Sequence, residues 1–286
     1  MQSDKILAIE SIKAVLAENP RITASKARDY TTLGLHWYKF AWVEPSTGAQ
    51  VKGCGAAIYD DLSIKKAWGE FVERYSFLKC SWDSKGFKNS NGFASHRSII
   101  EAHNASLCEL VERDIFLSCW LLKLPSMRIK SFHVIKNGLW FWYCLKILKR
   151  LGITVEFGLF GECMDILVGA AYIYDNNRFA VLPAAKSSQK ELIEKLTIEA
   201  IITASDWRSP AAPEPIYEIP DLPKPIDHLK FYLKTGRQRI IPFFLSDSLK
   251  VRKFPGFSYE QEDLTNQNPF AVASKYYISR SISNEC

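Results

Sequence analysis

The chain has 286 residues, of which 47% are hydrophobic and 24% are charged, and its formal net charge is +6. These proportions are typical of a globular protein, and they exclude collagen, coiled coil and intrinsic disorder. The excess of positive charge is small and contains no block of like charges, so it does not indicate nucleic acid. The longest unbroken apolar run, residues 139–145, is far shorter than the roughly 20 residues that a bilayer span needs.

The seven cysteines form no C-x-x-C pair, and the five histidines show no metal-ligand spacing, so we expect no zinc site. The N-terminal segment carries Asp4 and Glu10 among helically spaced isoleucines, which differs from the basic start and apolar middle of a signal peptide. We therefore expect a cytoplasmic protein with reduced thiols, without a membrane partner.

Periodicity predicts mixed helices and strands with short connections, that is, an α+β or mixed α/β fold. In chain order, the expected elements are a helix over 4–18, extended segments over 36–43 and 49–53, helices over 62–79 and 98–122, a buried helix from 137 to Gly152, strands over 153–157, 167–174 and 178–182, and a helix over 189–204.

Six of the 13 prolines lie between Ser209 and Asp227, too many for a helix or a central strand. We expect residues 1–208 to form one body. Residues 209–227 are then a linker or surface arm, and residues 228–286 a small extension packed on the body.

A short acidic motif occurs twice, 39 residues apart. The two copies are Glu70-Phe-Val-Glu73-Arg74 and Glu109-Leu-Val-Glu112-Arg113. Small residues precede each first glutamate by 17 and 15 positions: Gly53 and Gly55 in the first copy, Gly92 and Ala94 in the second. Ala184, 15 residues before Glu199, indicates a third and weaker copy. Each unit is predicted to be a small-residue loop followed by an acid-bearing helix.

One isolated E-x-x-E-R motif would be an ordinary helix salt bridge worth roughly 0.2–0.5 kcal/mol. Both copies, however, are surrounded by large apolar residues, which leave little room for a water-facing side. Buried carboxylates cost on the order of several kcal/mol each unless a cation neutralises them. Four glutamates with two arginines leave a deficit of positive charge. Mg²⁺ with a polyphosphate would supply the cation and give the guanidinium groups a partner. No P-loop or dinucleotide fingerprint accompanies the motif.

The residues around the second motif, NSNGFASH over 89–96 and LCELVERD over 107–114, resemble the central signature of the YcaO family. The sequence AWGEFVERY over 67–75 resembles the family's first acidic helix, and the likeness runs from about Gly53 to Arg208. The resemblance implies a YcaO-like fold with acid-bearing helices packed on a mixed sheet. It also implies an enzyme that uses ATP and Mg²⁺.

Carried over position by position, the resemblance implies Mg²⁺ ligands at Glu70, Glu73, Glu109 and Glu112. It implies ATP contacts by Arg74, Asn91, Arg113, Glu199 and Asp206, and it assigns no catalytic residue. Asn91 is equally well explained as a turn residue before Gly92. The sequence departs from the family at Ile202, where a glutamine is usual, and at Asp206, whose side chain is one carbon shorter than the usual acid.

Family members activate a peptide backbone amide with ATP, and the leading hypothesis is cyclodehydration of Cys, Ser or Thr to thiazoline or oxazoline in a ribosomally made peptide. The resemblance implies three partners: the precursor peptide, a leader-binding clamp protein like a ubiquitin-activating enzyme, and in some systems a flavin-dependent azoline dehydrogenase. Two alternatives stay open. One is thioamide or amidine formation with an external nucleophile, and the other is a noncatalytic YcaO-like scaffold subunit.

Overall fold

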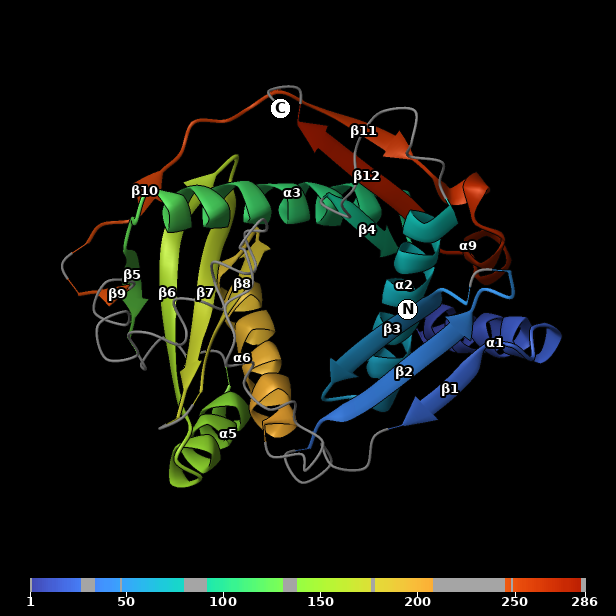
Figure 1. Ribbon diagram of the computed structural model, residues 1–286, viewed down its shortest axis with the longest axis horizontal. Coiled ribbons are helices and arrows are strands. Elements are labelled where there is room, and N and C mark those ends of the chain that lie inside the picture. The colour runs from blue at the N-terminus through green and yellow to red at the C-terminus, as the bar shows by residue number, and fades with distance from the viewer. Residues whose placement is uncertain are drawn as a thin grey trace. The chain divides into compact units, whose positions relative to one another are not determined.

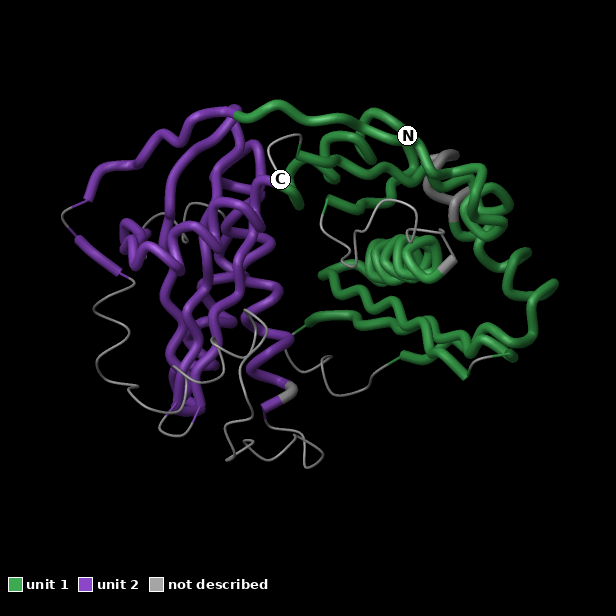
Figure 2. Tube along the Cα trace, turned by 45° about the horizontal axis from the view of Figure 1, so that its top comes forward, with its two compact units in different colours: residues 1–110, 257–286 green, residues 111–256 purple. Residues whose placement is uncertain are grey.

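The computed structural model describes residues 2–26, 34–46, 48–79, 92–130, 138–175, 178–207, 245–247 and 249–283. The chain forms two compact units, which Figure 2 colours separately. The first contains residues 1–110 and 257–286, and the second contains residues 111–256. Each unit builds its own sheets from helices and strands of mixed order, so the predicted mixed α/β class is confirmed.

The first unit contains two antiparallel three-stranded sheets among its described residues. One has the order β1 (Thr23–Lys26), β2 (His36–Val43), β3 (Gln50–Ala57), and the other β11 (Tyr259–Asp263), β12 (Tyr277–Ser283), β4 (Phe93–His96). The helical elements are α1 (Gln2–Glu18), α2 (Asp60–Lys79), the start of α3 (Ile99–Leu121), the 3₁₀ turn η3 (Thr265–Gln267) and α9 (Pro269–Ser274) (Figure 1).

Helix α2 packs on the β1–β2–β3 sheet through a continuous apolar face. Its residues Trp68, Phe71 and Tyr75 recur at helical spacing and are buried, while Phe40 and Trp42 alternate on β2 as a half-buried strand requires. The rings of Phe40 and Trp68 meet edge to face with their centroids 5.2 Å apart. Sequence pattern and packing therefore agree in this part of the core.

Two glycines bring the backbones of β3 and α2 into direct contact. A Cβ atom on Gly53 would lie 2.1 Å from the backbone nitrogen of Phe71, and one on Gly55 would lie 2.1 Å from that of Ala67. Neither glycine has a positive φ, so it is space and not backbone conformation that requires them. The absence of a side chain at both positions sets the depth at which α2 sits on the sheet.

The small residues before the acidic helices lie mainly in strands, so the prediction of a small-residue loop was wrong. Gly53 and Gly55 belong to β3, Ala94 to β4 and Ala184 to β8. The repeated unit is a strand followed by a helix, because these residues serve close packing and not a turn. Of these small residues, Gly92 fits the prediction of a loop, because its φ is +73°. A Cβ there would also lie 2.1 Å from the carbonyl oxygen of Ser281.

The second unit contains a mixed sheet with the order β8 (Phe179–Lys186), β7 (Ile166–Tyr174), β6 (Thr154–Cys163), β5 (Ser126–Ile129), β9 (Leu245–Ser246), and β10 (Arg252–Lys253) pairs with β6. Pairing is antiparallel from β8 to β5 and parallel at β9 and β10. Helices α5 (Leu139–Arg150) and α6 (Gln189–Asp206) pack together beside this sheet (Figure 1).

The compact units follow different boundaries from the expected body and extension. Residues 1–208 contribute to both units, and the C-terminal strands are built into both sheet systems. Strands β9 and β10 join the sheet of the second unit, whereas β12 lies between β11 and β4 in the first. The proline-rich stretch 209–227 lies outside the described residues. Among the helices that are described, none has the length and hydropathy of a bilayer span.

We predict that Gly55→Ala destabilises the protein by about 1–3 kcal/mol or more, because the new Cβ must displace the backbone of α2. Urea denaturation of the variant and the wild type measures the change. The matched control is Lys52→Ala, an exposed position on the same strand, which should alter stability by at most about 0.5 kcal/mol. Equal effects of the two substitutions would contradict the packing role of Gly55.

Candidate functional site

The first acidic motif lies on the face of α2 that runs beside β3. Glu70 Oε2 accepts a hydrogen bond of 2.8 Å from the backbone N–H of Cys54. Glu70 Oε1 accepts from Arg74, with Nε at 2.8 Å and Nη2 at 2.6 Å. The Glu70 side chain is 31% exposed and that of Arg74 is 59% exposed. The strand and the helix thus hold a half-buried carboxylate at their line of contact, with its guanidinium partner facing water.

The Glu70–Arg74 contact is also the i, i+4 salt bridge that an isolated motif would form. It differs from such a salt bridge because Glu70 also accepts a hydrogen bond from the backbone N–H of Cys54. A salt bridge on a fully solvated helix face would lack this bond. Glu73, one turn from Glu70, is half-buried on the same side of α2. Two carboxylates and one guanidinium therefore share this face of the first unit.

The second acidic motif lies on α3, which continues from the first unit into the second between residues 110 and 111. Glu109 is half-buried and belongs to the first unit. Glu112 belongs to the second, and only 4% of its surface is exposed, while Arg113 beside it is exposed. Glu112 Oε2 lies 3.7 Å from Nζ of Lys195, which comes from α6. The structure thus places a cation at the most buried acid of the set.

Lys195 is a residue that the sequence analysis did not single out. The available signal was its position four residues before Glu199, which puts both side chains on one face of the helix. Ile202, at the position of the usual glutamine, lies on the same half-buried stripe. The buried face of α6, which includes Leu192, Leu196 and Ala200, packs toward the sheet.

Both ends of α6 are anchored within the second unit. At its start, the Ser188 hydroxyl caps the helix by accepting a hydrogen bond from the backbone N–H of Glu191. At its end, Arg178 Nη1 donates to the carbonyl of Trp207, and the guanidinium lies 4.9 Å from the centre of the Trp207 ring. Asp175 holds the same guanidinium through Oδ2, at 3.0 Å from Nε. The helix that carries Glu199 is therefore fixed at both termini.

The predicted site residues that the structure describes divide between the two units. The first unit holds Glu70, Glu73, Arg74 and Glu109; the second unit holds Glu112, Arg113 and Glu199, together with Lys195. Asn91 and the side chain of Asp206 lie outside the described residues. That the two sets form one site remains a prediction.

The two sets differ in charge balance. Among the candidate residues alone, the first unit holds three carboxylates and one guanidinium, a formal balance of −3 + 1 = −2. In the second unit two carboxylates accompany Arg113 and Lys195, a balance of −2 + 2 = 0. The described residues contain no group of three or more His, Cys, Asp or Glu side chains arranged to hold a metal ion. Mg²⁺ does not require such a group, because it commonly takes one or two carboxylates together with phosphate oxygens and water. The donors of the first unit therefore fit Mg²⁺ with a bound polyphosphate.

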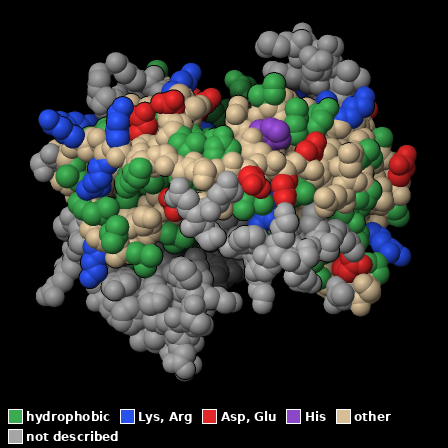
Figure 3. Space-filling view, turned by 90° about the horizontal axis from the view of Figure 1, so that it is seen from above, with side chains coloured by type: hydrophobic (Ala, Val, Ile, Leu, Met, Phe, Trp, Pro, Cys, Tyr) green, Lys and Arg blue, Asp and Glu red, His purple; other side chains and the backbone are tan. Residues whose placement is uncertain are grey.

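The histidines and cysteines near the motifs contribute no clear nucleophile. His96 Nδ1 lies 2.6 Å from Glu101, and both side chains are exposed. Burial raises the pKa of Cys119 and of Cys144 to about 11, so both thiols stay protonated at neutral pH. Figure 3 shows a face on which acidic and basic side chains are interspersed with hydrophobic ones.

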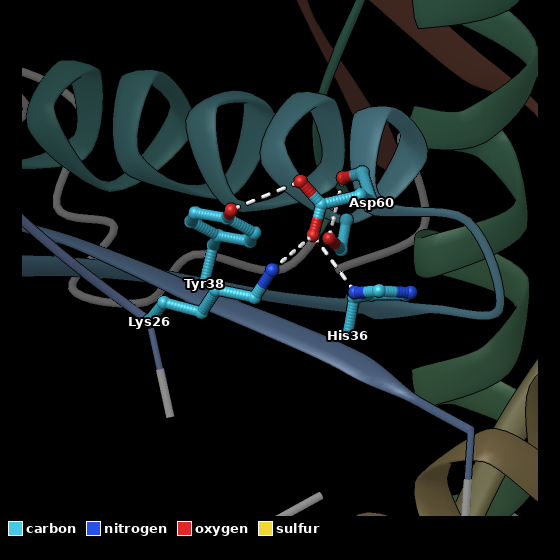
Figure 4. A network of polar contacts seen from close by, with 5 residues as sticks. Lys26, His36, Tyr38 and Asp60 are labelled. Carbon is cyan, nitrogen blue, oxygen red and sulfur yellow. Dashed lines mark hydrogen bonds and ion pairs between the residues drawn. The ribbon is translucent and has the colours of Figure 1, made fainter. Parts of the chain in front are cut away.

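A separate polar network anchors the start of α2 (Figure 4). Asp60, in the first turn, accepts hydrogen bonds from Lys26 on β1 and from the hydroxyl of Tyr38 on β2, and His36 Nδ1 lies 2.8 Å from Asp60 Oδ1. Burial alone would raise the pKa of Asp60, but the hydrogen bonds from Lys26 and Tyr38 together hold that pKa below its usual value. The network joins the edge strand β1 and the central strand β2 to the helix that carries the first motif.

Comparison with known proteins identifies a family pattern in the middle of the chain. Residues 80–188 match the model of the YcaO cyclodehydratases, which is described as ATP- and Mg²⁺-binding. No curated protein sequence matches the chain. The family match includes all of the second motif and ends before Glu199, and it begins after the first motif.

Several solved structures have a similar fold. YcaO from Methanopyrus kandleri bound with AMPPCP and Mg²⁺ matches 96% of this chain and 90% of its own length, with a TM-score of 0.63 and 13% identity. A heterocyclase in complex with substrate and cofactor has a TM-score of 0.64 and 12% identity over 92% of this chain, which spans about half (49%) of the heterocyclase. The E. coli microcin synthetase complex with pro-MccB17 bound has a TM-score of 0.59 and 13% identity, covering 91% and 87% of the two chains. The predicted YcaO-like fold is thereby confirmed.

We predict that Asp60→Asn lowers stability by about 1 kcal/mol or less at pH 7, since the side chain is more than one-third exposed. Because the folded-state pKa is depressed, the wild-type advantage is complete above the unfolded pKa near 4 and disappears as pH falls through the folded value. Urea titrations between pH 3 and pH 7 measure the difference in stability between the wild type and the variant. Asp61→Asn, at the adjacent exposed position, is the control. A difference that is as large at pH 3 as at pH 7 would contradict the charge-based role.

Proposed function

We propose that this chain, whose fold resembles that of YcaO structures and whose residues 80–188 match the YcaO family model, uses ATP to modify a peptide backbone amide. The observation that carries the proposal is the strand–helix unit that recurs in this fold. In β3–α2, β4–α3 and β8–α6, a glutamate stands 15 residues after a small strand residue. This recurrence supports one acidic function distributed over three helices.

The proposed reaction is cyclodehydration of Cys, Ser or Thr in a ribosomally made peptide. The thiol or hydroxyl adds to the carbonyl carbon of the preceding amide, and the resulting oxyanion takes the γ-phosphoryl group of ATP, which releases ADP. Loss of that oxygen as phosphate, together with the amide proton, leaves a C=N bond in a five-membered ring. The peptide loses one water in total, and ATP is converted to ADP and phosphate.

In this proposal the residues of the first unit hold Mg²⁺, which would screen the charge of the transferring phosphoryl group. Glu70, Glu73 and Glu109 offer carboxylate oxygens, and Mg²⁺ commonly takes one or two such carboxylates together with phosphate oxygens. Arg74 and Arg113 are exposed and can pair with phosphate oxygens through two parallel hydrogen bonds. Asn91, Glu199 and Asp206 are proposed to bind ATP, as the family resemblance implies.

A second candidate is a noncatalytic scaffold, and one observation favours it. Ile202 replaces the usual glutamine on the same face as Glu199, so α6 offers one polar ligand fewer there. The enzymatic proposal is preferred because both E-x-x-E-R motifs are intact and Glu70 and Glu73 lie on one face of α2.

The proposed partners are a precursor peptide and a leader-binding clamp protein, with a flavin-dependent azoline dehydrogenase in pathways that produce azoles. Two similar structures support this choice by their contents, since one heterocyclase contains a substrate and the microcin synthetase complex contains pro-MccB17. We propose that the complex acts in the cytoplasm.

We predict that Glu109→Gln or Arg113→Ala lowers ATP consumption, measured with partner and peptide present, by at least about 100-fold, because each removes charge stabilisation from phosphoryl transfer. The circular dichroism spectrum should be unchanged. Glu101→Gln is the control, since Glu101 lies on the same helix, is exposed and pairs with His96. Wild-type phosphate release by the two site variants would refute their assignment.

Mass spectrometry of the peptide product distinguishes the proposed reactions. Ring closure removes one water, whereas thioamide formation exchanges an oxygen for a sulfur, and amidine formation incorporates a nitrogen nucleophile. An unmodified peptide and no ATP consumption in the complete complex would favour the scaffold.

A further inference from the structure

The Glu112–Lys195 pair has one buried end and one accessible end. The Glu112 side chain is 5% exposed and that of Lys195 is 36% exposed, with Oε2 and Nζ 3.7 Å apart. This distance is within the range of an ion pair but beyond that of a direct hydrogen bond. The ammonium therefore neutralises the carboxylate while its own side chain remains partly in contact with solvent.

This contact removes the electrostatic reason for a metal ion at Glu112. A buried carboxylate needs a nearby cation, and Lys195 supplies one from within the second unit. The neighbouring α6 residue Ile202 has only a hydrocarbon side chain and offers no ligand atom. Arg113, the residue after Glu112, adds a second cationic side chain to this unit, and it is exposed.

The accessible groups of this set have the chemistry of a phosphate site. Glu112 is buried, so the groups that a ligand can reach are Lys195, Arg113 and, on the stripe with Lys195, Glu199. An ammonium group and a guanidinium group both bind phosphate, the first as a point charge and the second through paired hydrogen bonds. Two of the three accessible groups are therefore cationic, and the third, Glu199, is a carboxylate.

We propose that Lys195 contacts the phosphates of ATP, that Glu112 fixes the position of Lys195, and that Glu112 is therefore not a metal ligand. The inference rests on the proposed function, since it concerns the same nucleotide. It replaces the assignment of Glu112 to Mg²⁺ that the family resemblance implies, and it confines the metal ligands to Glu70, Glu73 and Glu109.

The test compares Lys195→Met, Glu112→Gln and the double variant with the wild type in the full-length chain. Isothermal titration with ATP in excess Mg²⁺ gives the affinity, and thermal melting gives the stability. We expect Lys195→Met to weaken ATP binding more than tenfold and to lower the melting temperature, because it leaves Glu112 without this cation. The double variant should recover the melting temperature but not the affinity. Lys190→Met, at an exposed position on α6, is the control and should match the wild type.

A second measurement addresses the metal directly. Mn²⁺ in place of Mg²⁺ can be titrated by electron paramagnetic resonance in the presence of ATP. Glu112→Gln should change the Mn²⁺ affinity less than threefold, whereas Glu70→Gln should weaken it more than tenfold. A tenfold loss in Glu112→Gln would overturn the inference, as would wild-type ATP affinity in the double variant. A wild-type protein that binds no ATP would instead refute the proposed function itself, and the inference with it.

Discussion

The backbone contact between β3 and α2 is the constraint on which the first unit depends. Gly53 and Gly55 leave no room for a side chain, so the helix lies directly against the strand. At that depth the apolar residues of α2 reach Phe40 and Trp42, and Glu70 reaches the backbone N–H of Cys54. The same packing that buries the aromatic core therefore places the Glu70 carboxylate at the edge of the contact. If the helix lay farther from the strand, this carboxylate would be solvated instead.

The two acidic motifs differ in the cations that neutralise their carboxylates, although their sequences are almost the same. The first motif has two carboxylates and one guanidinium, and Glu70 forms an ion pair with Arg74. The second has its most buried carboxylate beside Lys195. Repetition in sequence thus does not imply repetition of chemistry, because Glu70 pairs with Arg74 of its own helix, whereas Glu112 meets Lys195 of α6.

The secondary structure was largely predictable because it depends on local patterns. Strand β2 has the bounds that alternation predicted, and α2, α3 and α6 lie within two residues of the predicted helices. Strand β6 continues to Cys163, beyond the predicted end at Phe157, because residues 157–161 are buried on both faces and show no alternation. The role of Gly53 was misjudged, since glycine indicates a turn or a close contact equally well until the neighbouring helix is placed.

The amino-acid sequence alone determined the mixed fold class, the order of the elements and the repeated acidic motifs, because periodicity and spacing are properties of neighbouring residues. Only the tertiary structure decided that Lys195 meets Glu112, that β12 lies between β11 and β4, and that two glycines join α2 to β3. Such contacts connect distant residues: Lys195 and Glu112 are 83 positions apart, and Arg280 and Phe93 are 187 positions apart. No local pattern specifies them, since they depend on which surfaces become buried together when the chain folds.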